Sequence, residues 1–207
     1  MSRKNKLVFK QDKIFWTSDN HFYHKGVIGF CERPFQSLEE MNETMIINWN
    51  NVVSEDSTVI ICGDFIFSAN IELIKDLLSK LNGDKILILG NHCLQNRMDR
   101  DVIRKLFNDQ VYHQLEIEVE DVDGANGTQY IFNSHYPCVV WPKSHSGSWH
   151  CFGHVHTNGN NTGSESLLMI EYSKLCLKSH DAGVDNNGFT PIGYPKLKKI
   201  VNGNRNN

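Results

Sequence analysis

The chain has 207 residues, enough for one domain with a sizeable hydrophobic core. Hydrophobic residues make up 40% of it and charged residues 22%, a balance typical of globular rather than disordered proteins. The net charge of −3 excludes a general electrostatic attraction to nucleic acid or to anionic membranes.

The first half of the chain predicts alternating strands and helices. Short apolar runs predict buried strands at residues 13–17, 58–62 and 85–89. Apolar residues at helical spacing predict helices over residues 38–49, 71–81 and 98–107. Ser37 and Glu40 form a capping box at the start of the first helix, and Ser68 is expected to cap the second. This order favours a parallel sheet with right-handed crossovers, and hence an α/β fold.

The second half of the chain changes to a hairpin and short strands. Residues 112–120 alternate apolar and acidic side chains, and a turn at 123–127 leads into a strand at 128–133. Further strands are predicted at residues 148–152, 166–171 and 174–178. Because no repeat, linker or composition shift divides the chain, we expect a single domain over residues 1–207, with two packed sheets flanked by helices.

Five short polar clusters each follow a predicted strand. They are Asp19-Asn20-His21, Gly63-Asp64, Gly90-Asn91-His92, Ser134-His135-Tyr136 and Gly153-His154-Val155-His156. Ligands bind beyond the carboxyl ends of the strands in open α/β sheets, so one sheet edge is expected to gather the five loops into a crevice. The glycines in these clusters fit tight turns at strand ends, which often need a residue without Cβ.

These clusters supply side chains typical of a metal site. Two carboxylates, the Asn91 amide and five imidazoles offer hard oxygen and borderline nitrogen donors, which suit a pair of divalent transition metals better than calcium or a structural zinc. Two adjacent metals are a common device for cleaving phosphate esters. Each motif alone arises often by chance, and only the ordered set of five indicates this chemistry.

The motifs D-x-H, G-D, G-N-H, H and G-H-x-H resemble the calcineurin-like metallophosphoesterase family over most of the chain. The likeness extends to Phe22-Tyr23-His24-Lys25, Arg33-Pro34-Phe35 and Ser134-His135-Tyr136-Pro137, which are similar to small bacterial and phage members. The resemblance implies a four-layer fold in which a two-sheet β-sandwich is flanked by helices. It also implies a hydrolase that acts on phosphoric esters.

The resemblance further implies a role for each matched residue. Two divalent transition metal ions would be bound, the first by Asp19, His21 and His156, and the second by Asn91, His135 and His154. The Asp64 carboxylate would bridge them, since two cations at ~3.5–4 Å repel each other without a shared anion. His92 would protonate the leaving oxygen or hydrogen-bond to the phosphate, and His24 is the predicted substrate-binding residue. Mn is the favoured metal, although Fe, Zn, Ni and Co also tolerate this ligand set.

We expect hydrolysis by a hydroxide that bridges the metals, with small phosphodiesters or nucleotides as the preferred substrates. Phosphomonoesterase activity is the alternative within this class. A non-catalytic metal-binding scaffold of the same fold is the alternative outside it, although such scaffolds usually lose the residue equivalent to His92. Nucleic acid is allowed as a substrate but not favoured, and the oligomeric state is left open.

A cytoplasmic location without a role at membranes is expected. No apolar run approaches the ~20 residues that cross a bilayer, and no apolar segment follows the charged first residues as in a secretory signal. The six cysteines include no C-x-x-C pair, which argues against a cysteine zinc site.

Two positions depart from the family pattern. Many members continue the second motif as G-D-x-x-D and the third as G-N-H-D or G-N-H-E, where this chain has Phe67 and Cys93. His92 therefore lacks both usual acidic partners, and a backbone carbonyl is expected to hold its imidazole instead. Hydrolysis of esters with poor leaving groups is accordingly less expected than metal binding. Cys93 is predicted to be a packed thiol rather than a reactive one.

Some residues outside the core motifs have two interpretations. His24 is either a phosphate contact or a solvent-exposed loop histidine. Arg33 could clamp a substrate phosphate, but a structural ion pair is favoured. Surface positions are favoured over a mobile loop at the site mouth for His145 and His150. Buried aromatic packing is favoured over stacking on a nucleobase for Trp141 and Trp149.

Overall fold

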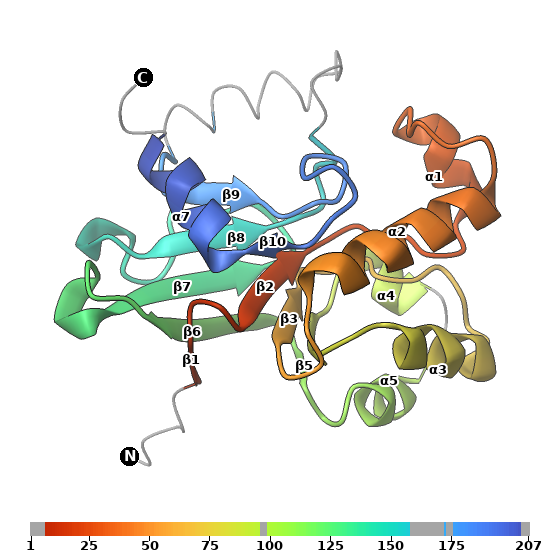
Figure 1. The fold of residues 1–207 in the computed structure, drawn as a ribbon, viewed down its shortest axis with the longest axis horizontal. Helices are drawn as coiled ribbons and strands as arrows, with labels where there is room; N and C mark the ends of the chain where they lie inside the picture. Colours follow the sequence, from red (N-terminus) through yellow and green to blue (C-terminus); the bar gives the residue numbers. More distant parts are fainter. Residues whose placement is uncertain (1–6, 96–98, 158–171, 173–175, 204–207) are drawn as a thin grey trace.

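Two sheets face each other across a shared core in the computed structural model, which describes residues 7–95, 99–157, 172 and 176–203 (Figure 1). The first sheet has the strand order β10-β2-β3-β4-β5, with bounds Ile192–Gly193 (β10), Ile14–Thr17 (β2), Thr58–Ile61 (β3), Asp84–Ile88 (β4) and Val111–Tyr112 (β5). The second sheet has the order β1-β6-β7-β8-β9, with bounds Val8–Phe9 (β1), Gln114–Glu120 (β6), Thr128–Ser134 (β7), Trp149–Phe152 (β8) and Ser179–Asp181 (β9).

The central strands of the first sheet are parallel and buried on both faces. β2, β3 and β4 pair in parallel, so their carboxyl ends lie at one edge of the sheet. Within β3, Ile60 packs in the core between the sheets, while Val59 and Ile61 pack on the helical side. A strand covered on both faces needs apolar side chains at successive positions, which is why residues 58–62 form one continuous apolar run.

Helices flank this sandwich (Figure 1). Their bounds are Lys25–Phe30 (α1), Leu38–Val52 (α2), Ile71–Lys80 (α3), Asn91–Gln95 (α4), Arg100–Leu106 (α5) and Tyr194–Gly203 (α7). α2, α3 and α5 bury Trp49, Leu77 and Ile103 on the outer side of the first sheet, whereas α7 buries Leu197 in the core between the sheets. The predicted fold class, α/β with a two-sheet sandwich flanked by helices, is therefore confirmed.

The start of α2 follows the predicted capping box with one change. Ser37 accepts a hydrogen bond from the Glu40 N–H at 3.1 Å, as expected of an N-cap residue. The Glu40 carboxylate accepts from the Gln36 N–H at 2.7 Å, one residue before the cap, rather than from the cap itself. Two side-chain hydrogen bonds, one from each end of the capping box, therefore still cap the N-terminus of α2.

The cap of α3 is Asn70, and the prediction of Ser68 was wrong. The Asn70 side chain accepts hydrogen bonds from the N–H groups of Glu72 and Leu73, at 3.1 and 3.2 Å. Ser68 instead accepts from the Asn70 N–H at 3.1 Å. Asn is as good an N-cap as Ser, and here it lies directly before the first helical residue.

The second half of the chain contains the predicted hairpin, but its first strand was drawn too long. Residues 112–120 divide between the sheets: β5 pairs with β4, and β6 pairs with β7. The crossover falls at the exposed His113, where the alternating pattern continues without a break. The strand predicted at 174–178 was also wrong in its described part, since β9 begins at Ser179. The strand predicted at 166–171 lies outside the described residues.

The core between the sheets contains the large side chains of both. The rings of Trp149 on β8 and Tyr194 on α7 stack with centroids 5.4 Å apart, and Trp16 on β2 lies 6.4 Å from the Tyr194 ring. Among the described helices, none is long and apolar enough to cross a membrane. This core fixes the two sheets relative to each other and so fixes the loops at their ends.

Candidate metal centre

Loops at the carboxyl ends of strands from both sheets meet at one edge of the sandwich. The segment after β2 carries Asp19 and His21, and the segment after β3 carries Asp64. The His21 N–H donates to the Asp64 carbonyl at 3.0 Å, which joins these two loops. α4 follows β4 and begins at Asn91. The loops after β7 and β8 carry His135, His154 and His156. The five motifs therefore converge as predicted, but at an edge of the sandwich formed by both sheets rather than at the edge of a single sheet.

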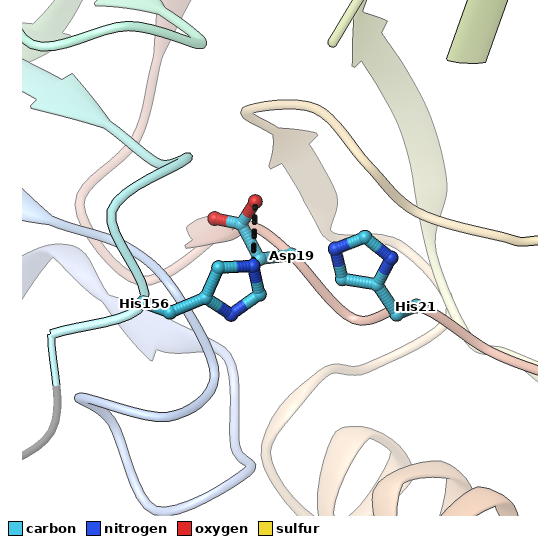
Figure 2. Close-up of side chains that lie close together, drawn as sticks. All are labelled: Asp19, His21 and His156. Atoms are coloured by element: carbon cyan, nitrogen blue, oxygen red, sulfur yellow. Dashed lines mark ion pairs between the residues drawn. The ribbon is translucent and has the colours of Figure 1, made fainter. Parts of the chain in front are cut away.

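Asp19, His21 and His156 form a first group, here called the first position. Their ligand atoms all lie within 4.8 Å of one another. Figure 2 shows the Asp19 carboxylate next to the His156 imidazole and the His21 imidazole to one side, with the contact of 3.9 Å from Asp19 Oδ1 to His156 Nε2 drawn as a dashed line. Asp19 Oδ2 accepts a hydrogen bond from the His154 N–H at 2.8 Å. Oδ1 is thus the oxygen that faces the imidazoles.

Asn91, His135 and His154 form the second position beside it. His135 Nε2 lies 2.9 Å from Asn91 Oδ1, and the rings of His135 and His154 have centroids 5.0 Å apart. His135 Nδ1 lies 2.8 Å from the carbonyl oxygen of Cys62. Each ring nitrogen of His135 thus faces an oxygen atom. A hydrogen on Nδ1, donated to the buried Cys62 carbonyl, would leave the lone pair of Nε2 and the Asn91 oxygen side by side for a metal.

Asp64 lies between the two positions. Its Oδ2 atom is 3.9 Å from His21 Nε2 and 3.5 Å from His135 Nε2. Its Oδ1 atom accepts a hydrogen bond from the His92 N–H at 2.9 Å. One oxygen of this carboxylate therefore faces ligands of both positions, and the other is occupied by the backbone of α4.

A buried carboxylate oxygen without a partner supports the fit of the residues present to a metal ion. Asp19 Oδ1 is buried and has no hydrogen-bond partner among the residues that the structure describes. Burial raises the pKa of Asp19 to about 7, because its charge lacks solvation. Burial, with the nearby charge of His156, lowers the pKa of His21 to about 2, so this imidazole is neutral, as a ligand must be. A divalent cation would compensate the buried carboxylates.

Most of the predicted ligands have left-handed backbone conformations. The φ angles are 51° at Asp19, 49° at His21, 47° at Asp64, 75° at His154 and 45° at His156. Asp and His tolerate this region better than most residues, but each such position still costs about 1–3 kcal/mol. Strain of this kind persists where the surrounding structure holds it, and its concentration at one cluster is typical of a functional site.

Two of the motif glycines leave room for a side chain from another loop. A Cβ at Gly63 would lie 2.2 Å from Nδ1 of His135, and a Cβ at Gly90 would lie 2.2 Å from Oδ1 of Asp64. Gly63 also has a positive φ of 107°, as the predicted tight turn requires. At Gly90 the close approach of the carboxylate is the reason for glycine.

His92 lies beside the first position in a group of aromatic rings. Its ring centroid is 5.2 Å from that of His21 and 5.9 Å from that of Phe67. Phe67 stacks on His24, with centroids 4.0 Å apart and planes inclined by 20°. The expected backbone carbonyl partner is not found at His92 Nδ1, which has no hydrogen-bond partner in the described part of the chain. Position 67, where relatives often have an acid, does lie against His92.

His24 and Cys93 are both partly buried. His24 precedes α1 and is neither a freely exposed loop residue nor a predicted metal ligand; burial lowers its pKa. Cys93 packs among apolar side chains on the helical side of the first sheet, and burial raises the pKa of its thiol. The packed, unreactive interpretation of Cys93 is confirmed.

Asp185 and Arg33 form an ion pair that contacts His156 of the first position. The favoured ion pair of Arg33 is confirmed: its Nε and Nη2 atoms donate to Asp185 Oδ1 and Oδ2 at 2.8 and 2.9 Å. Asp185 Oδ2 also lies 2.8 Å from His156 Nδ1. Burial disfavours protonation of His156, but the hydrogen bonds to Asp185 and Cys31 and the charge of Asp19 together outweigh it and raise the pKa to about 11, so a metal ion bound at this imidazole would displace a proton. Cys31, His156 and Asp185 also lie close enough together to share a metal ion, but the charge of the Asp185 carboxylate is already neutralised by Arg33.

Sequence reasoning missed Asp185 for a physical reason. It follows β9, whose residues Ser179–Asp181 are polar and show no strand pattern. Its partner Arg33 is 152 residues away along the chain. Only the folded chain brings the two together.

His150 is buried, so the favoured surface position was wrong. Its relative exposure is 0%, and its Nε2 lies 2.8 Å from Ser134 Oγ. The flanking Ser- and Gly-rich segment suggested the surface, but β8 runs between β7 and β9 and buries its side chains. His145 is exposed as predicted, and the buried aromatic packing favoured by the sequence is confirmed for Trp141 and Trp149.

The chain is similar to a known protein family and to several known proteins. The model of the calcineurin-like phosphoesterase family matches residues 12–141. Uncharacterized protein MJ1445 of Methanocaldococcus jannaschii is 48% identical over 81 residues, which cover 39% of this chain and 46% of that protein. Gene 66 protein of Mycobacterium phage L5 is 30% identical over 161 residues, with 69% of this chain and 77% of that protein covered. The crystal structure of AQ665 from Aquifex aeolicus, a protein of unknown function, matches with a TM-score of 0.62 at 22% identity, covering 90% of this chain and 98% of that one.

Proposed function

The chain belongs to the calcineurin-like phosphoesterase family, and on this premise we propose that it has a dinuclear metal site. Membership of this family supports the activity of a metal-dependent hydrolase of phosphate esters in general. The first and second positions would each hold one divalent transition metal ion, bridged by Asp64. Mn is the favoured ion, with Fe, Zn, Ni and Co as alternatives that suit the same mixed oxygen and nitrogen donors.

One contact pattern carries this proposal. A single oxygen of Asp64, Oδ2, lies within 4 Å of a nitrogen from each position, at 3.9 Å from His21 and 3.5 Å from His135. Two cations held close together need an anion between them. Asp19 Oδ1, which is buried and has no hydrogen-bond partner among the described residues, would add a second negative ligand on the side of the first position.

The chain's own residues would supply protons and orientation. Bound divalent ions would polarise the phosphate and lower the pKa of a water nucleophile. His92 lies next to the first position, and its imidazole would donate a proton to the leaving oxygen, an effect worth ~10²–10⁴-fold. His24, whose ring centroid is 6.3 Å from that of His92, would contact the substrate on the same side.

Small phosphodiesters or nucleotides are the proposed substrates. Phe67 beside His92 is 38% exposed, and Tyr136, whose ring lies 4.5 Å from that of His154, is 51% exposed. Exposed rings thus border both sides of the ligand group, and aromatic faces bind planar bases or aryl groups by stacking. The missing acidic partner of His92 favours esters whose leaving groups need little help from a proton.

Hydrolysis of bis-p-nitrophenyl phosphate in the presence of Mn²⁺ tests this function. We expect turnover that depends on added metal and disappears with a chelator. A folded preparation without activity toward any phosphate ester, with any of the five metals, would contradict the proposal.

Two alternatives give different results in the same experiments. A phosphomonoesterase would prefer mononucleotides over cyclic nucleotides and short single strands, so a panel of these substrates separates the two activities. A non-catalytic scaffold would show no turnover, and elemental analysis that finds less than one metal ion per chain after supplementation would favour it. The presence of His92 beside the ligand group argues against the scaffold.

A further inference from the structure

We propose that Asp185 is a positioning residue for the first position, acting through His156 and held in place by Arg33. The inference rests on the proposed function, because it takes His156 to be a metal ligand. Asp185 lies outside the five motifs and comes close to the site only in the folded chain.

The Asp185 carboxylate is buried between an imidazole and a guanidinium. Its Oδ2 lies 2.8 Å from His156 Nδ1, while Arg33 donates to both of its oxygens. The side chains of Arg33 and Asp185 are 0% and 2% exposed. A carboxylate paired in this way with a guanidinium is ionised and can only accept hydrogen bonds. His156 Nδ1 must therefore carry the hydrogen.

The hydrogen on Nδ1 assigns Nε2 as the atom of His156 that binds metal. Nε2 is the nitrogen that faces Asp19 Oδ1, at 3.9 Å. A carboxylate behind a metal-binding imidazole fixes the orientation of the ring and strengthens its electron donation. Loss of such a partner typically costs 10–100-fold in metal affinity.

Arg33 extends this support to a second ligand of the same position. Its Nη2 donates to the carbonyl of Asp19 at 2.7 Å, and its Nη1 donates to the carbonyl of Asn20 at 2.9 Å. One guanidinium therefore holds the backbone that carries Asp19 and the carboxylate that orients His156. Two ligands from distant parts of the chain are aligned by one buried ion pair.

Titration of metal-free protein with Mn²⁺ by calorimetry tests the role of Asp185. In Asp185→Asn, which keeps the shape but removes the charge, we expect the dissociation constant for Mn²⁺ to rise 10–100-fold. The thermal midpoint of the metal-free protein is recorded in parallel. Because this variant leaves Arg33 buried without a charged partner, a second variant replaces the pair, Arg33→Met with Asp185→Leu. Apolar replacement of a buried ion pair is often neutral for stability. The loss of affinity is expected to be at least as large, because the hydrogen bonds from Arg33 to the Asp19 and Asn20 carbonyls are lost as well.

Asp121→Asn is the matched control. Asp121 is also buried, and its carboxylate pairs with Lys198 at 2.8 Å, but its partners are Lys198 and Tyr194 rather than motif residues. We expect a lower thermal midpoint with wild-type affinity for Mn²⁺. Unchanged affinity in a folded Asp185 variant overturns the positioning role alone, and so does an equal loss of affinity in the control. A wild-type protein that binds no divalent ion overturns the proposed function together with this inference.

Discussion

The His92 N–H donates a hydrogen bond to Asp64 Oδ1 at 2.9 Å, so the proposed proton donor is held by the proposed bridging carboxylate. The other oxygen of Asp64 faces His21 and His135. A change at Asp64 should therefore disturb both the metal ligands and the start of α4. A change in the His92 side chain should leave this contact intact, because the backbone makes it.

Asp64→Ala should lose metal and activity together. Without the shared carboxylate, two cations have no anion between them, and we expect turnover to fall at least ~10²-fold. Elemental analysis and hydrolysis of bis-p-nitrophenyl phosphate measure both effects. A variant that keeps two metal ions and full activity would show that the bridging assignment is wrong.

His92→Ala should lower turnover and spare metal content. The imidazole is proposed to supply a proton worth ~10²–10⁴-fold, and its backbone contact to Asp64 does not need the side chain. The loss should be largest for substrates with poor leaving groups and smallest for p-nitrophenyl esters. An equal loss for both kinds of substrate would argue against proton donation.

Gly90→Ala should disrupt the site from within its backbone. The new Cβ would lie 2.2 Å from Asp64 Oδ1, so the carboxylate must move. We expect the free energy of unfolding to fall by about 1–3 kcal/mol and bound metal to be lost. Gly29→Ala is the control, since a Cβ at this exposed position of α1 meets nothing within 4 Å and should stabilise by about 0.5–1 kcal/mol. Full metal content in Gly90→Ala would contradict the steric argument.

Phe67→Asp should extend hydrolysis toward poorer leaving groups. The ring of Phe67 lies 5.9 Å from that of His92, so an acid at this position can pair with the imidazole. The dependence of log kcat on the pKa of the leaving group should become shallower than in the wild type. Phe67→Leu separates this effect from loss of the stack on His24 and should leave the slope unchanged. The same slope in all three proteins would show that position 67 does not act through His92.

The free energy of unfolding should decrease as the pH is lowered, because of the buried His150. Burial lowers its pKa to about 3 from an ordinary value of 6.5. Between these values the unfolded chain binds a proton that the folded chain does not, so the free energy of unfolding falls as the pH drops through this window. At 1.36 kcal/mol per unit, His150 should contribute a loss of about 2 kcal/mol between pH 7 and pH 5.

Urea unfolding of metal-free protein at these two pH values measures the loss. In His150→Gln, which keeps an amide opposite Ser134 but does not titrate, the difference should be about 2 kcal/mol smaller than in the wild type. Identical pH dependence in both proteins would rule out this contribution of His150.

The first sheet and the convergence of the motifs could be predicted because they follow from short-range patterns. A parallel strand covered on both faces is apolar at successive positions, and residues 14–16, 59–62 and 86–89 within the predicted strands 13–17, 58–62 and 85–89 satisfy this rule. Parallel strands end at one edge, so polar residues after them must meet there. This rule accounts for the motifs after β2, β3 and β4, whereas the motifs after β7 and β8 reach the same edge because the second sheet packs against the first.

The parts that could not be predicted depend on contacts between distant segments. α1 contains Gly26 and Gly29 among its six residues, which hides its helical pattern. β9 is short and polar, and it is a strand because β8 lies beside it. The burial of His150 and the contact between Arg33 and Asp185 likewise exist only after folding. Tertiary packing decided each of these cases.

The hydrogen bonds on the two buried carboxylates have a consequence for which cations the site admits. Asp19 Oδ2 is occupied by the His154 N–H, and Asp64 Oδ1 is occupied by the His92 N–H. Each carboxylate would therefore offer one oxygen to a metal ion, as a monodentate ligand. Ca²⁺ commonly takes both oxygens of a carboxylate to reach six to eight ligands, and here it would first have to break a backbone hydrogen bond. Backbone hydrogen bonds at the proposed site would thus disfavour Ca²⁺ relative to a transition metal ion.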